Sequence, residues 1–238
     1  MRKIISTILF IVLLNFAGSV WAMEPYLAKL CQDTKFTCIK VHRGDTWENM
    51  FADPELRGIV MRFNRMDVEP KPNQTIVVPD DMADVKLMDL SPFDSQIPAP
   101  GEKTIIVNPS LNAWGAYDAE GHLVKWGPAS TGSDWCSDTG RGCRTTSGDF
   151  SIYRVGGPSC ASTKFPLPHG GAPMPYCMFF DKGEAIHGSD EVMGYNASHG
   201  CVRIFVDDAR WLNKDFIDRP DDGGTKVIVL KYPEKTQI

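Results

Sequence analysis

The seven cysteines constrain this 238-residue chain more than any other feature of its sequence. Six of them lie close together in pairs: Cys31 with Cys38, Cys136 with Cys143, and Cys160 with Cys177. Disulfides between these neighbours would close short loops and stabilise the fold by about 2–4 kcal/mol each. Six cysteines allow about 15 pairings, so the spacing favours these three bonds but leaves the connectivity open. The seventh cysteine, Cys201, is the one most easily left unpaired.

The first 22 residues indicate that the chain is exported, and export is the condition under which cysteines pair. A basic start, a mostly apolar stretch over residues 4–16 and the small-residue site Val20-Trp21-Ala22 are typical of a signal peptide. An uncleaved anchor is the alternative, but the apolar run is short for a span of about 20 residues. We therefore expect cleavage, export across the inner membrane, and a periplasmic or cell-envelope protein without an integral membrane domain.

The charge balance argues against nucleic acid as a partner. The chain carries 25 Lys and Arg residues against 30 Asp and Glu residues, which gives a formal charge of −5. Nucleic acids and anionic membranes attract proteins that present a basic patch, and no such patch is evident. The sequence indicates no cofactor, and it carries no signal for the oligomeric state.

Residues 39–79 are expected to form a small α+β domain that follows an irregular segment at 23–38. Short strands are predicted at 39–42 and 75–78 because these runs are apolar and lie beside turn residues. Between them, Asp45 or Thr46 can cap a first helix, and Pro54 can begin a second.

The resulting strand–helix–helix–strand unit resembles a LysM module. The resemblance rests on Val41-x-x-Gly44-Asp45-Thr46, on Asn64 and on the final Ile76-Val77-Val78-Pro79. It implies binding to glycan that contains N-acetylglucosamine, chiefly peptidoglycan. The Leu-x-x-Gly that usually precedes the last strand is absent, and a docking domain without a ligand is the alternative.

Residues 80–102 are rich in Asp and Pro and are interpreted as an extended connector, either solvated or packed on one domain. Residues 103–232 have a β pattern, a late helix capped by Asp207 or Asp208, and a tail at 233–238. Many short strands with one helix predict a mainly β sandwich or partly open barrel. The expected strands are 104–107, 113–117, 122–126, 150–153, 176–180, 185–187, 201–206 and 227–230.

The chemistry is expected around Cys201. A thiol attacks carbonyl groups as its thiolate, so near neutral pH it needs a base, and His187 and His199 lie close to it in sequence. Gly200 would allow its N–H group, with that of Cys201, to face a developing oxyanion. Two alternatives are a buried structural thiol and a zinc site. Zinc held by Cys201, His187 and His199 would lack the fourth ligand of a structural site.

The strings Ala185-Ile186-His187-Gly188 and Ser198-His199-Gly200-Cys201-Val202-Arg203 closely resemble the active-site signature of the L,D-transpeptidases, the YkuD-like family. The resemblance spans residues 103–231 and includes Trp126 to Gly132 and Thr145 to Phe150, where the family's usual Pro is absent. It implies an L,D-transpeptidase-like β-sandwich or barrel that needs no metal or cofactor.

Carried over to this chain, the family pattern makes Cys201 the nucleophile and His187 its base. The bridged cysteines outside the signature are expected to brace loops beside the cleft, including a lid around Pro166 to Pro175. Gly188 is expected to orient His187, and His199 to assist the oxyanion region or the substrate. Ser198 is expected in the same hydrogen-bonding shell, as a substrate-binding residue, and Arg203 to hold the local structure or bind a substrate carboxylate. Tyr176 and Trp126 are expected to line the substrate groove.

The resemblance implies that the enzyme forms 3→3 crosslinks between peptidoglycan stem peptides through a cysteine thioester, and that carbapenems acylate it. With water as acceptor it would be an L,D-carboxypeptidase, and with a lipoprotein lysine an anchoring enzyme. A non-catalytic wall-binding protein is a further alternative. A papain-like endopeptidase is disfavoured because its Cys usually precedes its His, whereas His187 precedes Cys201.

Overall fold

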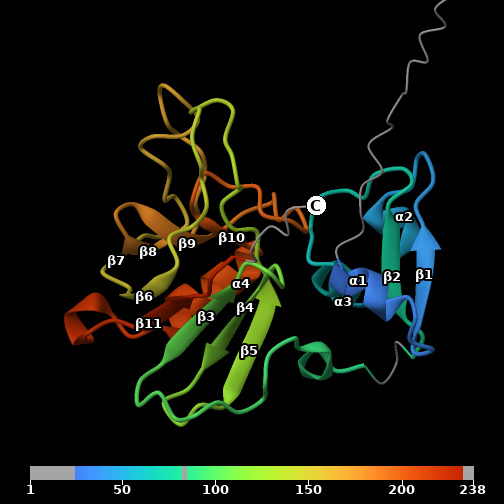
Figure 1. The fold of residues 1–238 in the computed structure, drawn as a ribbon, viewed down its shortest axis with the longest axis horizontal. Coiled ribbons are helices and arrows are strands. Elements are labelled where there is room, and N and C mark those ends of the chain that lie inside the picture. Colours follow the sequence, from blue (N-terminus) through green and yellow to red (C-terminus); the bar gives the residue numbers. More distant parts are fainter. Residues whose placement is uncertain (1–24, 82–84, 233–238) are drawn as a thin grey trace, which may run out of the picture.

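The computed structural model describes residues 25–81 and 85–232. The expected signal peptide at 1–22 and the expected tail at 233–238 lie outside the described residues. A small unit that contains α1, α2, α3, β1 and β2 lies beside a larger β-rich unit (Figure 1). None of the helices in the described ranges has the length and apolar character needed to cross a membrane.

The small unit is a two-stranded antiparallel sheet covered by helices. Thr46 caps the first of the two central helices with its side chain and Pro54 begins the second, as predicted; Asp53 caps this second helix. Its core contains Val41, Trp47 and Ile76. Its elements are α1 (Pro25–Leu30), β1 (Phe36–Lys40), α2 (Trp47–Met50), α3 (Pro54–Phe63) and β2 (Thr75–Pro79).

The expected irregular segment at 23–38 is wrong in part, because it contains α1 and the beginning of β1. The strand predicted at 39–42 starts earlier because its partner β2 extends to Pro79, which pairs with Phe36. The Phe36 ring also stacks on Phe63 of α3, with 5.1 Å between the ring centroids, and this contact holds the early residues in the sheet.

The larger unit contains two β-sheets, which confirms the mainly β class. One sheet has the order β5-β4-β3-β11-β6 and the other the order β10-β9-β8-β7. The strands of the first are β3 (Thr104–Asn108), β4 (Ala113–Tyr117), β5 (Leu123–Pro128), β6 (Gly148–Ser151) and β11 (Lys226–Val229). Those of the second are β7 (Arg154–Val155), β8 (Met178–Asp181), β9 (Glu184–Gly188) and β10 (Val202–Ile204).

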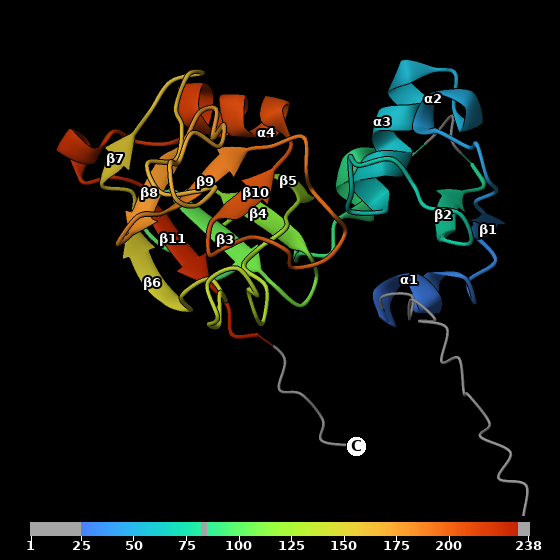
Figure 2. The same cartoon turned by 90° about the horizontal axis from the view of Figure 1, so that it is seen from above.

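The main core lies between these two sheets. Ile105 and Val227 come from the first sheet, and Met178 and Ile186 from the second, and all four are fully buried in one cluster. Helix α4 (Val206–Trp211) packs against β9 at one side of the sandwich (Figure 2). The remaining helical turns are η1 (Leu87–Leu90), η2 (Leu212–Phe216) and η3 (Pro220–Asp222).

The predicted cap of α4 is wrong. The helix begins after Phe205 without a side-chain cap. Asp208 is instead completely buried and forms ion pairs with Arg62 of α3 and Lys125 of β5. A charge removed from water needs such partners, so the carboxylate joins the small unit to the sandwich instead of capping a helix.

The connector packs on the larger unit, as one of the two expected alternatives has it, and is not a solvated linker. Leu87, Leu90 and Phe93 pack on a buried cluster formed by Tyr117, Leu123 and Trp126. The Trp126 indole N–H donates to the Leu87 carbonyl oxygen at 2.7 Å. Segment 85–102 therefore covers the sheet beside β4 and β5, because apolar residues spaced between its Asp and Pro residues gain burial there.

Candidate active site

The pairing of β9 with β10 places the predicted nucleophile beside its predicted base. The two strands are parallel, with Val202 level with Ile186 and Arg203 level with His187. Cys201 precedes β10 and therefore lies level with Ala185, two positions before His187. Because alternate side chains share one face of a strand, Ala185 and His187 face the side on which Cys201 packs.

His187 is held in one tautomer. Its side chain is only 5% exposed, and its Nδ1 atom lies 2.8 Å from the carbonyl oxygen of Gly188. A carbonyl oxygen accepts only, so Nδ1 carries the hydrogen and Nε2 keeps a free lone pair. Burial lowers the pKa of His187 to about 4, with a smaller contribution from the nearby charge of Arg203, and the hydrogen bond to the Gly188 backbone acts in the opposite direction. The ring is therefore neutral near pH 7 and can accept a proton at Nε2.

Cys201 is the one cysteine outside a disulfide, and all seven lie in the described ranges. Its half-buried Sγ atom lies 3.9 Å from the carbonyl oxygen of Gly183. Burial raises the pKa of Cys201 to about 11, and the charge of Glu184 adds to this shift. A hydrogen bond from the Ala185 backbone and the charge of Arg203 act in the opposite direction. The resting site thus contains a neutral thiol and a neutral imidazole.

The turn before the nucleophile is held by Ser198. Its hydroxyl donates to the carbonyl oxygen of Cys201 and accepts the N–H of Gly200 at 3.1 Å. Gly200 has φ of 129°, a conformation that favours glycine. The oxyanion role expected for the Gly200 N–H is therefore not available in this conformation, because the donor is already engaged. Ser198 is 2% exposed and lines the cleft, and its hydroxyl makes both of these hydrogen bonds within the turn.

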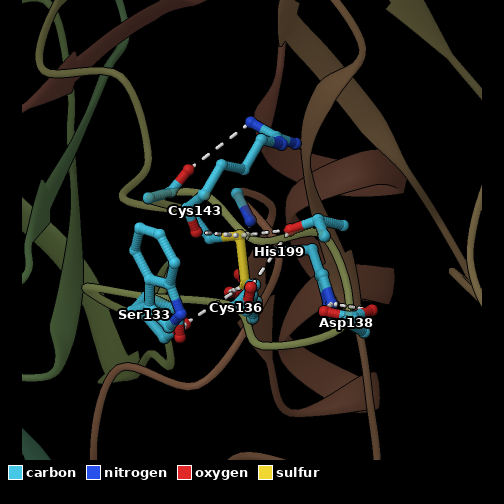
Figure 3. Close-up of a disulfide and its surroundings, with 12 residues drawn as sticks. Ser133, Cys136, Asp138, Cys143 and His199 are labelled. Carbon is cyan, nitrogen blue, oxygen red and sulfur yellow. Dashed lines mark hydrogen bonds and ion pairs between the residues drawn. A yellow bond between two sulfur atoms is a disulfide. The ribbon is translucent and has the colours of Figure 1, made fainter.

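Two disulfide-closed loops meet at His199. Its Nε2 atom lies 2.8 and 2.9 Å from the two carboxylate oxygens of Asp138, within the loop closed by Cys136 and Cys143 (Figure 3). On another side its ring centroid lies 4.3 Å from that of Phe165, which belongs to the loop closed by Cys160 and Cys177. Sequence reasoning missed Asp138 and Phe165 because no motif marks them, and the close cysteine pairs were the only signal.

A cleft of about 1040 Å³ contains the site. His187, Cys201 and His199 line it, together with both disulfide-closed loops. Arg203 also lines it and forms an ion pair with Glu191 at 3.0 Å. The cleft is thus bounded by the connection between β9 and β10 on one side and by the braced loops on the other.

Two expected groove residues lie elsewhere. Trp126 is fully buried under the connector and does not border the cleft. Tyr176 packs against the main core, and its neighbours Pro175 and Cys177 line the cleft in its place. Both aromatic rings gain more by apolar burial than by facing a polar groove.

A group of possible metal ligands is formed by Cys136, Asp138 and His199, with ligand atoms within 4.8 Å of one another. Cys136 is bonded to Cys143 and has no thiolate to offer, so this donor set does not fit a metal ion. Cys201 and His187 do not belong to the group.

The family model described as "YkuD: L,D-transpeptidase catalytic domain" matches residues 102–229. No curated protein matches the chain. Among solved structures, an L,D-transpeptidase from Xylanimonas cellulosilytica is 23% identical, with a TM-score of 0.52, and the match covers 72% of this chain and 78% of that one.

Two further solved structures are an L,D-transpeptidase from Stackebrandtia nassauensis and one from Mycobacterium smegmatis. The first is 22% identical with a TM-score of 0.45, over 59% of this chain and 61% of that one. The second is 19% identical with a TM-score of 0.43, over 55% and 59%. At 23% identity, the likeness to the Xylanimonas cellulosilytica structure concerns the fold alone.

Proposed function

Because this chain belongs to the YkuD family of L,D-transpeptidase catalytic domains, we propose that it is a peptidoglycan L,D-transpeptidase that forms 3→3 crosslinks through a thioester on Cys201. The observation that carries the proposal is a single unbridged thiol that shares a cleft and a parallel strand pair with a buried imidazole, whose Nε2 has no hydrogen-bond partner among the described residues. Six other cysteines are bonded, so a free thiol in an exported protein calls for a chemical role.

In the first half-reaction, Cys201 Sγ attacks the carbonyl carbon of the third stem residue while its proton passes to Nε2 of His187. The C–N bond to the terminal D-Ala then breaks, and His187 returns the proton to the leaving amine. This leaves a thioester and a neutral imidazole. Both pKa shifts support a proton transfer that occurs during the attack, because neither group is charged at rest.

In the second half-reaction, the side-chain amine of another stem attacks the thioester carbonyl. Its proton passes to His187 as the C–N bond forms, and the thiol is regenerated as the C–S bond breaks. Water in place of the amine would give a tripeptide, and a lipoprotein lysine would give an anchored protein. The large open cleft supports a peptide acceptor, since two chains must meet at one sulfur.

The test is mass spectrometry of the full mature chain incubated with tetrapeptide stems. We expect a covalent adduct equal to the donor without D-Ala, and crosslinked dimers among the products. Cys201→Ala should form neither product, and a carbapenem should give an adduct on the parent chain that Cys201→Ala lacks. Tripeptides as the only product would contradict crosslinking, and the absence of any adduct would contradict the thioester mechanism.

We further propose that residues 39–79 are a LysM-like module that binds glycan and keeps the enzyme in the cell envelope. Its antiparallel strand–helix–helix–strand arrangement supports this assignment. Asn64 is a structural residue of the unit, because its side chain accepts from the N–H of Val77 and donates to the Val77 carbonyl oxygen. Sedimentation of Cys201→Ala with purified peptidoglycan tests binding separately from catalysis, and a protein that stays in the supernatant would overturn it.

A further inference from the structure

Glu184 lies beside the nucleophile at the opposite end of β9 from His187. Cys201 is level with Ala185 in the register of β9 and β10. Glu184 precedes Ala185 on β9 and is therefore an immediate neighbour of Cys201. A Cβ atom placed on Gly200 would lie only 3.2 Å from Oε1 of Glu184. The carboxylate therefore stands against the turn that carries the thiol, and it lines the same cleft.

Within the described ranges, the hydrogen bonds to the Glu184 carboxylate come from neutral donors. Thr146 donates its backbone N–H to Oε2 at 3.0 Å and its hydroxyl to Oε1 at 3.1 Å. A carboxylate has about four lone-pair sites, so both oxygens can accept further bonds. None of the ion pairs among the described residues involves Glu184.

The surroundings of Glu184 disfavour its ionised carboxylate when no cation is bound to it. Partial burial raises the pKa of Glu184 above its usual value, the two hydrogen bonds from Thr146 oppose this rise, and the nearby charge of Asp181 adds to it. Arg141 acts in the opposite direction through its charge but does not pair with the carboxylate. A desolvated carboxylate gains most from a partner that brings both positive charge and N–H donors.

We propose that Glu184 is the ammonium-binding residue of the cleft and accepts hydrogen bonds from the side-chain ammonium of a stem-peptide diamino acid. This inference rests on the proposed function, which supplies substrates that carry such a group. Two stems enter the reaction, the donor that is acylated and the acceptor that attacks. The ligand chemistry is the same in both, and an experiment separates the two sources.

For an acceptor, the proton balance is as follows. The amine arrives as an ammonium, held at the carboxylate, and loses one proton to solvent before it attacks. The neutral amine then attacks the thioester carbonyl, and one of its protons passes to Nε2 of His187 as the C–N bond forms and the C–S bond breaks. His187 then returns that proton to Sγ of Cys201. Glu184 thus binds and orients the amine, and His187 alone carries the transferred proton.

The experiment compares the full mature chain with Glu184→Gln, which removes the charge but keeps side-chain hydrogen bonding. The donor arm measures single-turnover thioester formation from two tetrapeptides that differ only in a free or an acetylated third side-chain amine. The acceptor arm starts from the preformed thioester and measures the ratio of aminolysis to hydrolysis. Thr146→Val is the matched control, because it removes one hydrogen bond to the carboxylate and leaves the charge in place.

We expect the parent chain to prefer the charged amine by about tenfold to hundredfold in one of the two arms, since hydrogen bonds to charged groups have this strength. Glu184→Gln should abolish that preference, and Thr146→Val should retain it. The affected arm identifies the donor or the acceptor as the source of the ammonium.

Three results would overturn the inference. The parent chain could show no preference for the charged amine in either arm, a result that does not depend on the folding of any variant. Glu184→Gln could keep the parent preference, or Thr146→Val could lose it to the same extent. If the parent chain formed no thioester from either donor, the proposed function itself would fail, and that outcome is distinct from the other three.

Discussion

The neutral state of the Cys201–His187 pair makes a quantitative prediction about the reactivity of the thiol. With a pKa of about 11 for Cys201, the thiolate fraction at pH 7.5 is about 0.03%, against about 9% for a free cysteine of pKa about 8.5. Alkylation by iodoacetamide, which needs the thiolate but no protein base, should therefore be about 300-fold slower than for an unperturbed thiol at this pH.

The alkylation rate should rise about tenfold per pH unit from pH 7 to pH 10, because each unit increases the thiolate fraction tenfold below the pKa. The rate rises with pH because burial raises the pKa of the Cys201 thiol and lowers that of the His187 imidazole. The thiol is therefore mostly protonated, and the imidazole neutral, across this range. Intact mass spectrometry of the non-reduced chain measures the rate at one site, since the other six cysteines are bonded.

The His187→Gln variant distinguishes the protonation state of the resting thiol, which alkylation measures, from proton transfer during catalysis, which thioester formation measures. The variant should keep the pH slope of alkylation, because the thiolate does not depend on a charged ring. It should lose about 10²- to 10⁴-fold in thioester formation, because the proton acceptor is gone. A parent alkylation rate that is constant between pH 5 and 8 and collapses in His187→Gln would refute this reasoning, because it would show a thiolate–imidazolium pair at rest.

Two predictions concern stability, measured by urea unfolding of the full mature chain. Asp208→Ala leaves Arg62 and Lys125 without their buried partner and should cost about 3–5 kcal/mol; a loss below about 1 kcal/mol would contradict a structural role for this carboxylate. Asp67 accepts the Val192 N–H at 2.8 Å, and burial raises its pKa to about 6. The folded state therefore binds an extra proton between about pH 4 and pH 6, and stability falls as pH rises through this window. Asp67→Asn should be the more stable protein above pH 6 and should match the parent near pH 4, and equal stability at every pH would contradict the shift.

The parts of the fold that were predictable are those whose signal is local. The strands at β3, β4 and β11 are apolar runs between turn residues, and the predicted ranges differ from the observed ones by about one residue. Thr46 caps the first helix and Pro54 begins the second, because both roles depend on the neighbouring backbone alone. The signature around Cys201 was visible because its residues lie on two segments that are close in the chain.

The parts that were not predictable depend on partners far away in sequence. Asp208 has the sequence context of a helix cap, but Arg62 and Lys125 are 146 and 83 residues away, and no local pattern shows them. Trp126 lies in a predictable strand, but the local sequence does not show that the connector buries its side chain. Asp138 is a loop residue in an acidic chain, and only the folded cleft brings it to His199.

Contacts from distant parts of the chain also meet at the connection between β9 and β10, which carries the segment before the nucleophile. Asp67 of the small unit exchanges backbone and side-chain hydrogen bonds with Val192. Asp138 holds His199, and the backbone of Ser130 pairs with Arg203. A parallel strand pair leaves its connection long and unsupported by its own ladder, so its conformation must come from outside. The position of Cys201 relative to His187 is therefore set by the signature together with the small unit and a braced loop, which explains why short-range motifs identify the reactive residues but not the groups that hold them.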